Sequence, residues 1–159
     1  MIDFDKIWVE KYRPTTLDDI ILDERTLKQV KEFKEEIPNL LFVGNPGTGK
    51  TTLARIIVND VLGCNYLYIN ASDESGIDTI RHSITNFAQT KSFDGKVKVV
   101  ILDEADGLTT QAQSALRNTM ETYAKYCRFI LTANYKHKII PALQSRCQAL
   151  DIKPVVELA

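Results

Sequence analysis

The stretch GNPGTGKTT at residues 44–52 constrains the fold of this chain more than any other feature. It stands directly after the apolar run Leu40–Val43 and fits the pattern G-x-x-x-x-G-K-[S/T] at every fixed position. Because glycine lacks a Cβ atom, the backbone can curl until successive N–H groups point inward at an anion, and the following helix adds its positive end. The stretch therefore predicts a phosphate-binding loop between a strand and a helix.

The polar residues that close this loop suit the phosphate chain of a nucleotide. We expect Lys50 to neutralise charge on the β- and γ-phosphates and the Thr51 hydroxyl to bind Mg²⁺, which prefers hard oxygen ligands. A glycine-rich turn with an incidental lysine is the alternative interpretation. The candidate nucleotide-binding residues of the loop are Gly44, Asn45, Pro46, Gly47, Thr48, Gly49, Lys50, Thr51 and Thr52.

Apolar runs and helical periodicity alternate along the chain. Runs that are apolar on both faces suit strands covered by helices on either side, and this alternation predicts an α/β fold with a parallel sheet. The five candidate strands are residues 39–43, 65–70, 97–102, 128–133 and 147–152. The candidate helices are residues 27–37, 50–62, 77–88, 110–124 and 138–143. Gly63 is placed to end the second helix in a left-handed conformation.

Composition indicates one globular domain, because the chain has 159 residues, 44% of them hydrophobic, and a formal net charge of −1. No apolar run approaches the roughly 20 residues of a bilayer crossing, and the first residues lack the apolar region of a signal peptide. We therefore expect a cytoplasmic protein, or a nuclear or host-cytoplasmic one if its source is eukaryotic or viral. The three cysteines lack C-x-x-C spacing, which favours reduced thiols over disulfides or zinc ligands.

Two carboxylates end the third apolar run. The stretch VVILDEAD at residues 99–106 puts Asp103 and Glu104 at the carboxyl end of a buried strand, where open α/β sheets bind ligands. Asp103 suits Mg²⁺, either directly or through water, and Glu104 suits polarising a water for attack on the γ-phosphate. A plain helix start is the alternative interpretation of this acidic pair.

Two polar residues later in the chain are further candidates: one follows the fourth candidate strand and the other follows the last candidate helix. Asn134, after the run RFILTA, can hold the attacking water or the γ-phosphate, although an asparagine after a strand is usually a turn residue. Arg146 lies between the short last helix and the last strand, and the residues alone indicate only a surface charge or a salt bridge. His82 and His137 have no partners at metal-ligand spacing.

Seven short motifs occur in the order found in one known family. Together they make the chain resemble the ATPase domain of clamp-loader small subunits, over about residues 8–151. That family includes the replication factor C small subunits and their phage counterparts, which are AAA+ ATPases that open a ring-shaped sliding clamp and place it on primer–template DNA. The motifs are YRP (12–14), GNPGTGKTT (44–52), NASDESGID (70–78), LDEAD (102–106), AQSALRNTME (112–121), LTAN (131–134) and QSRC (144–147).

The resemblance implies a three-layer α/β/α P-loop NTPase fold of the AAA+ type, with a five-stranded parallel sheet, ATP and Mg²⁺ as cofactors, and ATP hydrolysis. Asn134 matches the residue that senses the γ-phosphate. Arg146, in the S-R-C match, is implied to be an arginine finger that reaches the ATP of a neighbouring subunit, so an isolated subunit should hydrolyse poorly. The residues implied to hold and hydrolyse MgATP are Lys50, Thr51, Asp103 and Glu104, and those implied to lie against the adenine are Tyr12, Arg13 and Pro14.

The family also implies partners: the other subunits of a pentamer, the sliding clamp and primer–template DNA, with no membrane. Its DNA contacts fall on Ser75 and Arg81, although many relatives carry arginine where this chain has Ser75. We expect an N-terminal segment at 1–24, the ATPase domain at 25–153 and, at 154–159, the start of a connection to a lid. We expect the chain to lack the lid and collar domains of the family and to be a monomer with little ATPase activity.

Three other interpretations of the sequence are alternatives to a clamp-loader subunit. A DEAD-box RNA helicase is suggested by the letters DEAD at 103–106, but Asp103 follows Lys50 closely, no second RecA-like domain is present, and LTAN replaces the S-A-T element. A Holliday-junction branch-migration motor, or another AAA+ remodeller, shares the two nucleotide motifs and an arginine acting in trans. The domain could also be a non-hydrolysing AAA+ assembly module.

Overall fold

The computed structural model of this chain describes residues 24–33, 36–73, 76–90 and 95–152. In these residues five strands form one sheet in the order β2-β3-β4-β1-β5, and every neighbouring pair is parallel. The parallel five-stranded sheet predicted from the sequence is therefore confirmed. The strands are β1 (Leu40–Val43), β2 (Tyr66–Asn70), β3 (Lys98–Asp103), β4 (Cys127–Ala133) and β5 (Gln148–Asp151).

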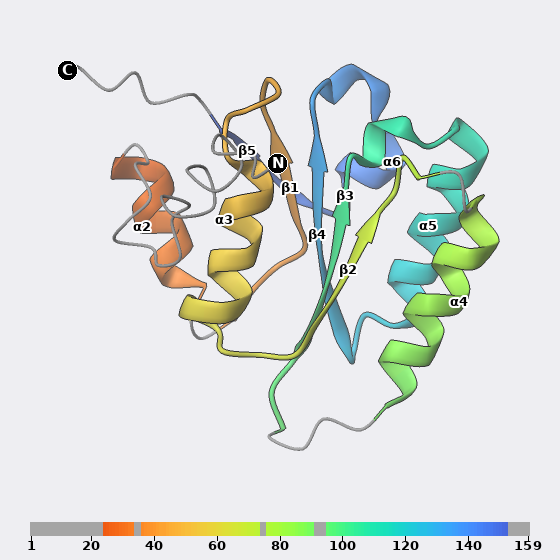
Figure 1. The fold of residues 1–159 in the computed structure, drawn as a ribbon, viewed down its shortest axis with the longest axis horizontal. Coiled ribbons are helices and arrows are strands. Elements are labelled where there is room, and N and C mark those ends of the chain that lie inside the picture. Colours follow the sequence, from red (N-terminus) through yellow and green to blue (C-terminus); the bar gives the residue numbers. More distant parts are fainter. Residues whose placement is uncertain (1–23, 34–35, 74–75, 91–94, 153–159) are drawn as a thin grey trace, which may run out of the picture.

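Helices cover both faces of this sheet, so the three-layer α/β/α architecture is also confirmed. The helices α2 and α3 lie on one side, and α4, α5 and α6 lie on the other (Figure 1). Each side has its own cluster of buried apolar residues, centred on Phe42 and Leu53 on the first side and on Phe129 and Leu116 on the second. The helices are α2 (Glu24–Glu32), α3 (Lys50–Ile56), α4 (Gly76–Gln89), α5 (Thr110–Thr122) and α6 (Pro141–Gln144).

Several helix boundaries differ from the sequence prediction, and three of these differences are instructive. The helix predicted to begin at residue 138 begins at Pro141, because Ile140 precedes a proline and stays extended with φ −62° and ψ 146°. The helix predicted over residues 27–37 ends as α2 at Glu32, where the N–H of Phe33 donates to the Val30 carbonyl in a tightened last turn.

The third difference lies between α3 and Gly63. There the chain continues α3 as a π-helical turn, η2 (Ile57–Val61), rather than as α-helix. Gly63 then has φ 57°, which confirms the predicted left-handed end. Two short 3₁₀ helices, η3 (Ala105–Gly107) and η4 (Lys136–Lys138), follow β3 and β4. None of the helices in the described ranges is long and apolar enough to cross a membrane.

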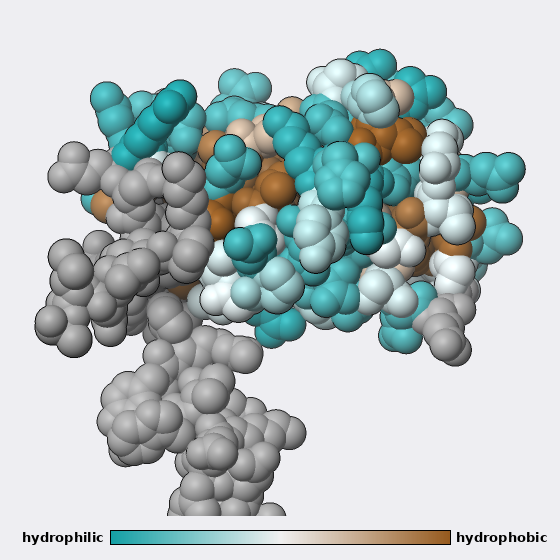
Figure 2. Space-filling view, turned by 90° about the horizontal axis from the view of Figure 1, so that it is seen from above, coloured by the Kyte–Doolittle hydropathy of each residue, from teal (hydrophilic) through white to brown (hydrophobic). Residues whose placement is uncertain are grey.

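The carboxyl ends of the strands meet at one edge of the sheet. The register pairs Val43 of β1 with Ala133 of β4, and Asn70 of β2 with Asp103 of β3. Figure 2 looks down on this edge, where hydrophilic residues surround smaller patches of hydrophobic ones. The loops that follow β1, β3 and β4 therefore converge, which is where a parallel sheet of this kind binds ligands.

Candidate nucleotide-binding site

The loop between β1 and α3 is shaped by its glycines. Gly47 and Gly49 have φ 83° and 86°, in the left-handed region that residues with a Cβ rarely adopt. Gly44 is needed for a different reason, because a Cβ there would lie 2.4 Å from the Ile152 carbonyl oxygen. The chain after β5 therefore packs directly against the start of the loop, and Ile152 donates its N–H to the Val43 carbonyl at 2.7 Å.

Lys50, the first residue of α3, is nearly buried at 8% exposure. Its Nζ donates to the carbonyl oxygens of Gly44 at 2.7 Å and Asn45 at 3.0 Å, and to Oδ1 of Asn134 at 3.0 Å. Burial lowers the pKa of this ammonium, while the nearby carboxylates, Asp103 first, oppose the shift. Neutral oxygen atoms thus hold the Lys50 ammonium at the base of the loop. An anionic phosphate oxygen can take the place of these acceptors.

Asp103, at the end of β3, accepts hydrogen bonds on both carboxylate oxygens. Its Oδ1 receives the hydroxyls of Thr51 at 2.8 Å and Thr132 at 2.5 Å. Its Oδ2 receives the hydroxyl of Tyr68 at 2.7 Å. Burial, and then the hydrogen bond to Asp103, raise the pKa of Tyr68 to about 12, so this hydroxyl is protonated and donates at neutral pH.

Glu104 follows in an unusual backbone conformation. Its φ of 57° is the only positive φ among the described non-glycine residues, and such strain is concentrated at functional sites. The N–H of Glu104 donates to the Thr132 hydroxyl at 2.9 Å. Its carboxylate accepts a hydrogen bond from the Ser72 hydroxyl, which is also 2.7 Å from Oδ1 of Asn70. Glu104 is thus exposed at the rim of the site and in contact with the chain that follows β2.

Hydrogen bonds to the backbone hold Asn134 in place. Asp106 accepts the N–H groups of Asn134 at 3.0 Å and Tyr135 at 3.2 Å, which ties the end of β4 to the 3₁₀ turn after β3. Because its amide oxygen accepts from Lys50, Asn134 connects the phosphate loop to the neighbouring strand.

Part of the phosphate loop, the start of α3 and the polar residues at the ends of β3 and β4 line one pocket of about 240 Å³. Its donor set fits a phosphate chain with Mg²⁺, since Thr51 and Asp103 offer the hydroxyl and carboxylate oxygens that this ion prefers. The Thr48 hydroxyl in the same loop is buried without a hydrogen-bond partner, as expected of a group that awaits a ligand. The lining residues are Pro46, Gly47, Gly49, Lys50, Thr51, Thr52, Asp103, Glu104, Thr132 and Asn134.

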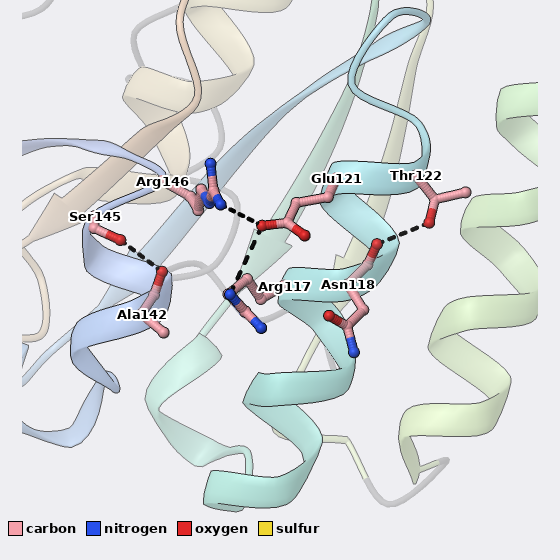
Figure 3. A network of polar contacts seen from close by, with 7 residues as sticks. All are labelled: Arg117, Asn118, Glu121, Thr122, Ala142, Ser145 and Arg146. Carbon is pink, nitrogen blue, oxygen red and sulfur yellow. Dashed lines mark hydrogen bonds and ion pairs between the residues drawn. The ribbon is translucent and has the colours of Figure 1, made fainter.

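Arg146 lies apart from this pocket, in the turn between α6 and β5. Its Nη2 is 2.6 Å from Oε1 of Glu121 on α5, and Nη1 of Arg117 is 3.7 Å from the same oxygen (Figure 3). The Arg146 side chain is 52% exposed. It is not among the residues that line the pocket of its own chain.

Several predicted residues and segments cannot be placed in this geometry. Tyr12, Arg13, Pro14 and Ser75 lie outside the described residues, as do the segments 1–23 and 153–159. Arg81 is described and lies exposed on α4. The three cysteines are free thiols, as expected from their spacing. Among the described residues no group of His, Cys, Asp and Glu side chains has the arrangement of a metal site.

Sequence reasoning missed four residues that contact the predicted ones. Thr132 and Tyr68 hold Asp103, Ser72 contacts Glu104, and Asp106 holds the backbone of Asn134. For Thr132, Ser72 and Asp106 the available signal was a hydroxyl or carboxylate close to the carboxyl end of a strand, whereas Tyr68 lies in the middle of β2. That signal does not say which side chain a residue meets across the sheet.

The phosphate loop after β1, the acidic end of β3 and the polar residue after β4 define the class of P-loop nucleotide-binding proteins. Residues 40–154 match the family described as "ATPase family associated with various cellular activities (AAA)". The chain belongs to this AAA family.

Among curated proteins the chain is similar to replication factor C subunits, which confirms the resemblance to clamp-loader small subunits. It is 50% identical to the replication factor C small subunit of Archaeoglobus fulgidus, over 94% of this chain and 49% of that protein. It is 49% identical to replication factor C subunit 3 of Blastobotrys adeninivorans, over 94% of this chain and 46% of that protein. The chain therefore spans about half the length of the curated relatives it matches.

Solved structures confirm the fold. The Thermotoga maritima RuvB Holliday junction branch migration motor superposes with a TM-score of 0.67 at 21% identity, over 89% of this chain and 48% of that one. A second RuvB structure from the same organism gives a TM-score of 0.69 at 18% identity, over 90% and 49%. At these identities the likeness concerns the fold alone.

Proposed function

We propose that this chain is the ATPase module of a clamp-loader subunit, which binds and hydrolyses MgATP to place a sliding clamp on primer–template DNA. The observation that carries the proposal is the convergence of Lys50, Thr51, Asp103 and Asn134 on one pocket within the described residues. Similarity to replication factor C small subunits at 50% identity supports the clamp loader over other AAA assemblies.

Binding follows from the loop and the start of α3. The first N–H groups of a helix have no partner within the helix, and those at the start of α3 face the loop where the phosphates would lie. Lys50 adds a positive charge, and it exchanges its neutral acceptors for phosphate oxygens when the nucleotide enters. Thr51 and Asp103 would hold Mg²⁺, which supplies charge neutralisation at the β- and γ-phosphates when bound.

Hydrolysis requires a base and a residue that orients the water. Glu104, at the rim of the pocket, can accept a proton from the attacking water once its carboxylate leaves the Ser72 hydroxyl. Asn134 is neutral, so it can orient the water or the γ-phosphate without changing the charge of the site. Its backbone, fixed by Asp106, gives that amide a defined position.

Arg146 is the residue that we propose acts on a neighbour. Its guanidinium is exposed and bound to Glu121 rather than to the pocket, as expected of a side chain that completes the ATP site of an adjacent subunit. A cation aimed at the γ-phosphate from outside offsets the negative charge that develops during transfer. An assembled ring would then hydrolyse faster than a single chain.

The wider assignments also remain proposals. Tyr12, Arg13 and Pro14 are proposed to lie against the adenine, and Arg81, with Ser75, to face DNA. We propose the division at residues 24 and 153, a pentameric assembly when the lid and collar are present, and work in the compartment that holds replicating DNA. A branch-migration motor is the second candidate, because the RuvB structures share the fold.

Two measurements test the proposal. First, the 159-residue chain should bind a fluorescent ATP analogue with Mg²⁺, and Lys50→Ala should abolish most of that binding. Second, the ATPase activity of the protein assembled with the clamp-loader subunits of its source should rise on addition of the clamp and primed DNA. Stimulation by a four-way junction instead of primed DNA and clamp would support the second candidate and remove the first. If Glu104→Gln leaves turnover in the assembly unchanged, the domain is a non-hydrolysing module.

A further inference from the structure

The carboxylate of Asp103 is held by three hydroxyls from three different elements. Thr51 of α3 and Thr132 of β4 both donate to Oδ1, at 2.8 and 2.5 Å. Among the described residues only Tyr68 donates to Oδ2, at 2.7 Å. Thr51 is also the proposed ligand of Mg²⁺, and its oxygen can bind the metal through a lone pair while its hydrogen still points to Asp103. Thr132 and Tyr68 are not proposed metal ligands, so they hold Asp103 from within the sheet, one on each oxygen.

Tyr68 reaches Asp103 because of the register between β2 and β3. Tyr68 is paired with Ile101, two positions before Asp103 in the neighbouring parallel strand. Residues two apart in a strand lie on the same face of the sheet, and a tyrosine ring is long enough to span that step. The contact therefore follows from the pairing of β2 with β3.

The ring of Tyr68 is itself held from the other side. The Arg55 guanidinium, in the last turn of α3, lies 4.7 Å from the ring centroid. Its Nε is buried without a hydrogen-bond partner, and the guanidinium lies over the ring in a cation–π contact. Arg55 belongs to the helix that begins with Lys50 and Thr51. The same helix, α3, thus contributes the proposed phosphate and metal residues Lys50 and Thr51 and the guanidinium that stacks on Tyr68.

We propose that Tyr68 is a positioning residue for Mg²⁺, whose hydroxyl fixes Oδ2 of Asp103 while Arg55 fixes its ring. This inference rests on the proposed function, in which Thr51 and Asp103 hold the metal. Hydrogen bonds to metal-ligating groups typically change metal affinity by about 10- to 100-fold when they are removed. Tyr68 therefore sets how much Mg²⁺ the site needs, without touching the nucleotide.

The test is the Mg²⁺ dependence of nucleotide binding. The variant Tyr68→Phe keeps the ring and its stacking on Arg55 and removes only the hydroxyl. We expect the Mg²⁺ concentration that half-saturates tight binding of the fluorescent ATP analogue to rise about tenfold. Binding of the analogue in EDTA should change by less than about twofold, since no metal is then involved. Tyr66→Phe, two residues earlier on the same strand, is the matched control and should behave like the unmodified chain.

A double variant separates this inference from the proposed function. If Tyr68 acts through Asp103, Tyr68→Phe adds no further change once Asp103→Asn is present. An Asp103→Asn variant with unchanged Mg²⁺ dependence would remove the proposed metal role itself. If Asp103→Asn shifts the Mg²⁺ midpoint and Tyr68→Phe does not, only the role of Tyr68 is wrong. Equal loss of binding with and without Mg²⁺ in Tyr68→Phe would overturn it too, and thermal unfolding of each variant identifies any that fails to fold.

Discussion

The phosphate pocket and the Arg146 turn lie in the same domain but are held in opposite ways. In the pocket the Lys50 ammonium and the Asp103 carboxylate are nearly buried, and each has three hydrogen-bond partners from the same chain. Arg146 is half exposed, and its recorded ion pair is with Glu121. The difference supports the proposal that the chain forms its own binding site for ATP and offers Arg146 to another molecule.

The largest expected effect is on ATP turnover and comes from changing the exposed residue, Arg146. Arg146→Ala should lower ATP turnover in the assembled complex by about 10³-fold or more, as for other arginine fingers. ATP binding by the same chain should be nearly unchanged, because Arg146 does not line that pocket. Steady-state ATPase and equilibrium binding assays measure the two quantities, with Arg25→Ala on α2 as the control. Equal loss of both would place Arg146 within its own site.

A second change acts at the rim of the pocket. Glu104→Gln should reduce turnover in the complex by about 10²- to 10⁴-fold, the usual contribution of a general base. Binding of ATP should persist, since the amide keeps the size of the side chain and the contact to Ser72. Single-turnover hydrolysis checks this, with Glu36→Gln at the opposite edge of the sheet as the control. Turnover close to that of the unmodified complex would exclude Glu104 as the base and favour a non-hydrolysing module.

The variant Lys50→Ala tests the buried phosphate pocket. Hydrogen bonds to charged groups contribute about 1.5–3 kcal/mol, so ATP binding by the chain alone should weaken by about 10- to 100-fold. Titration with the fluorescent analogue measures it. Lys125→Ala, which removes an exposed lysine after α5, should leave the affinity unchanged. An unaffected Lys50→Ala would mean that the phosphates bind elsewhere.

The smallest expected effect comes from Glu121→Gln and tests whether the ion pair with Glu121 orients Arg146. Glu121→Gln removes the ion pair at 2.6 Å, and exposed pairs contribute about 0.2–1 kcal/mol. We therefore expect turnover of the neighbouring site to fall by about fivefold at most, with ATP binding unaltered, because Arg146 loses its preferred orientation. The same ATPase assay measures it. A rise in turnover would instead mean that Glu121 restrains Arg146.

The sequence predicted what depends on local chemistry. The glycine loop, the acidic end of β3 and the strand positions follow from spacing and apolar patterning, which act within a few residues. Contacts across the sheet could not be predicted in the same way. Tyr68 meets Asp103 only because β2 and β3 pair in one particular register, and Ser72 meets Glu104 only because of the turn that follows β2.

The same limit applies to Arg146 and to the helix ends. Nothing in the local sequence indicates that Arg146 and Glu121 meet, because they come from different elements that the fold brings together (Figure 3). The π-helical turn at Ile57–Val61 lies partly in the core, where Ile57 and Val58 are fully buried. Apolar periodicity finds such a segment but does not distinguish π from α geometry.

The most direct test is a crystal structure of the chain with Mg²⁺ and a non-hydrolysable ATP analogue. The account predicts phosphates against the amides of residues 47–50, Thr51 and Asp103 at the metal, and Arg146 still on the outer side near Glu121. Asp103 turned away from the metal, or Arg146 of the same chain on the γ-phosphate, would contradict it.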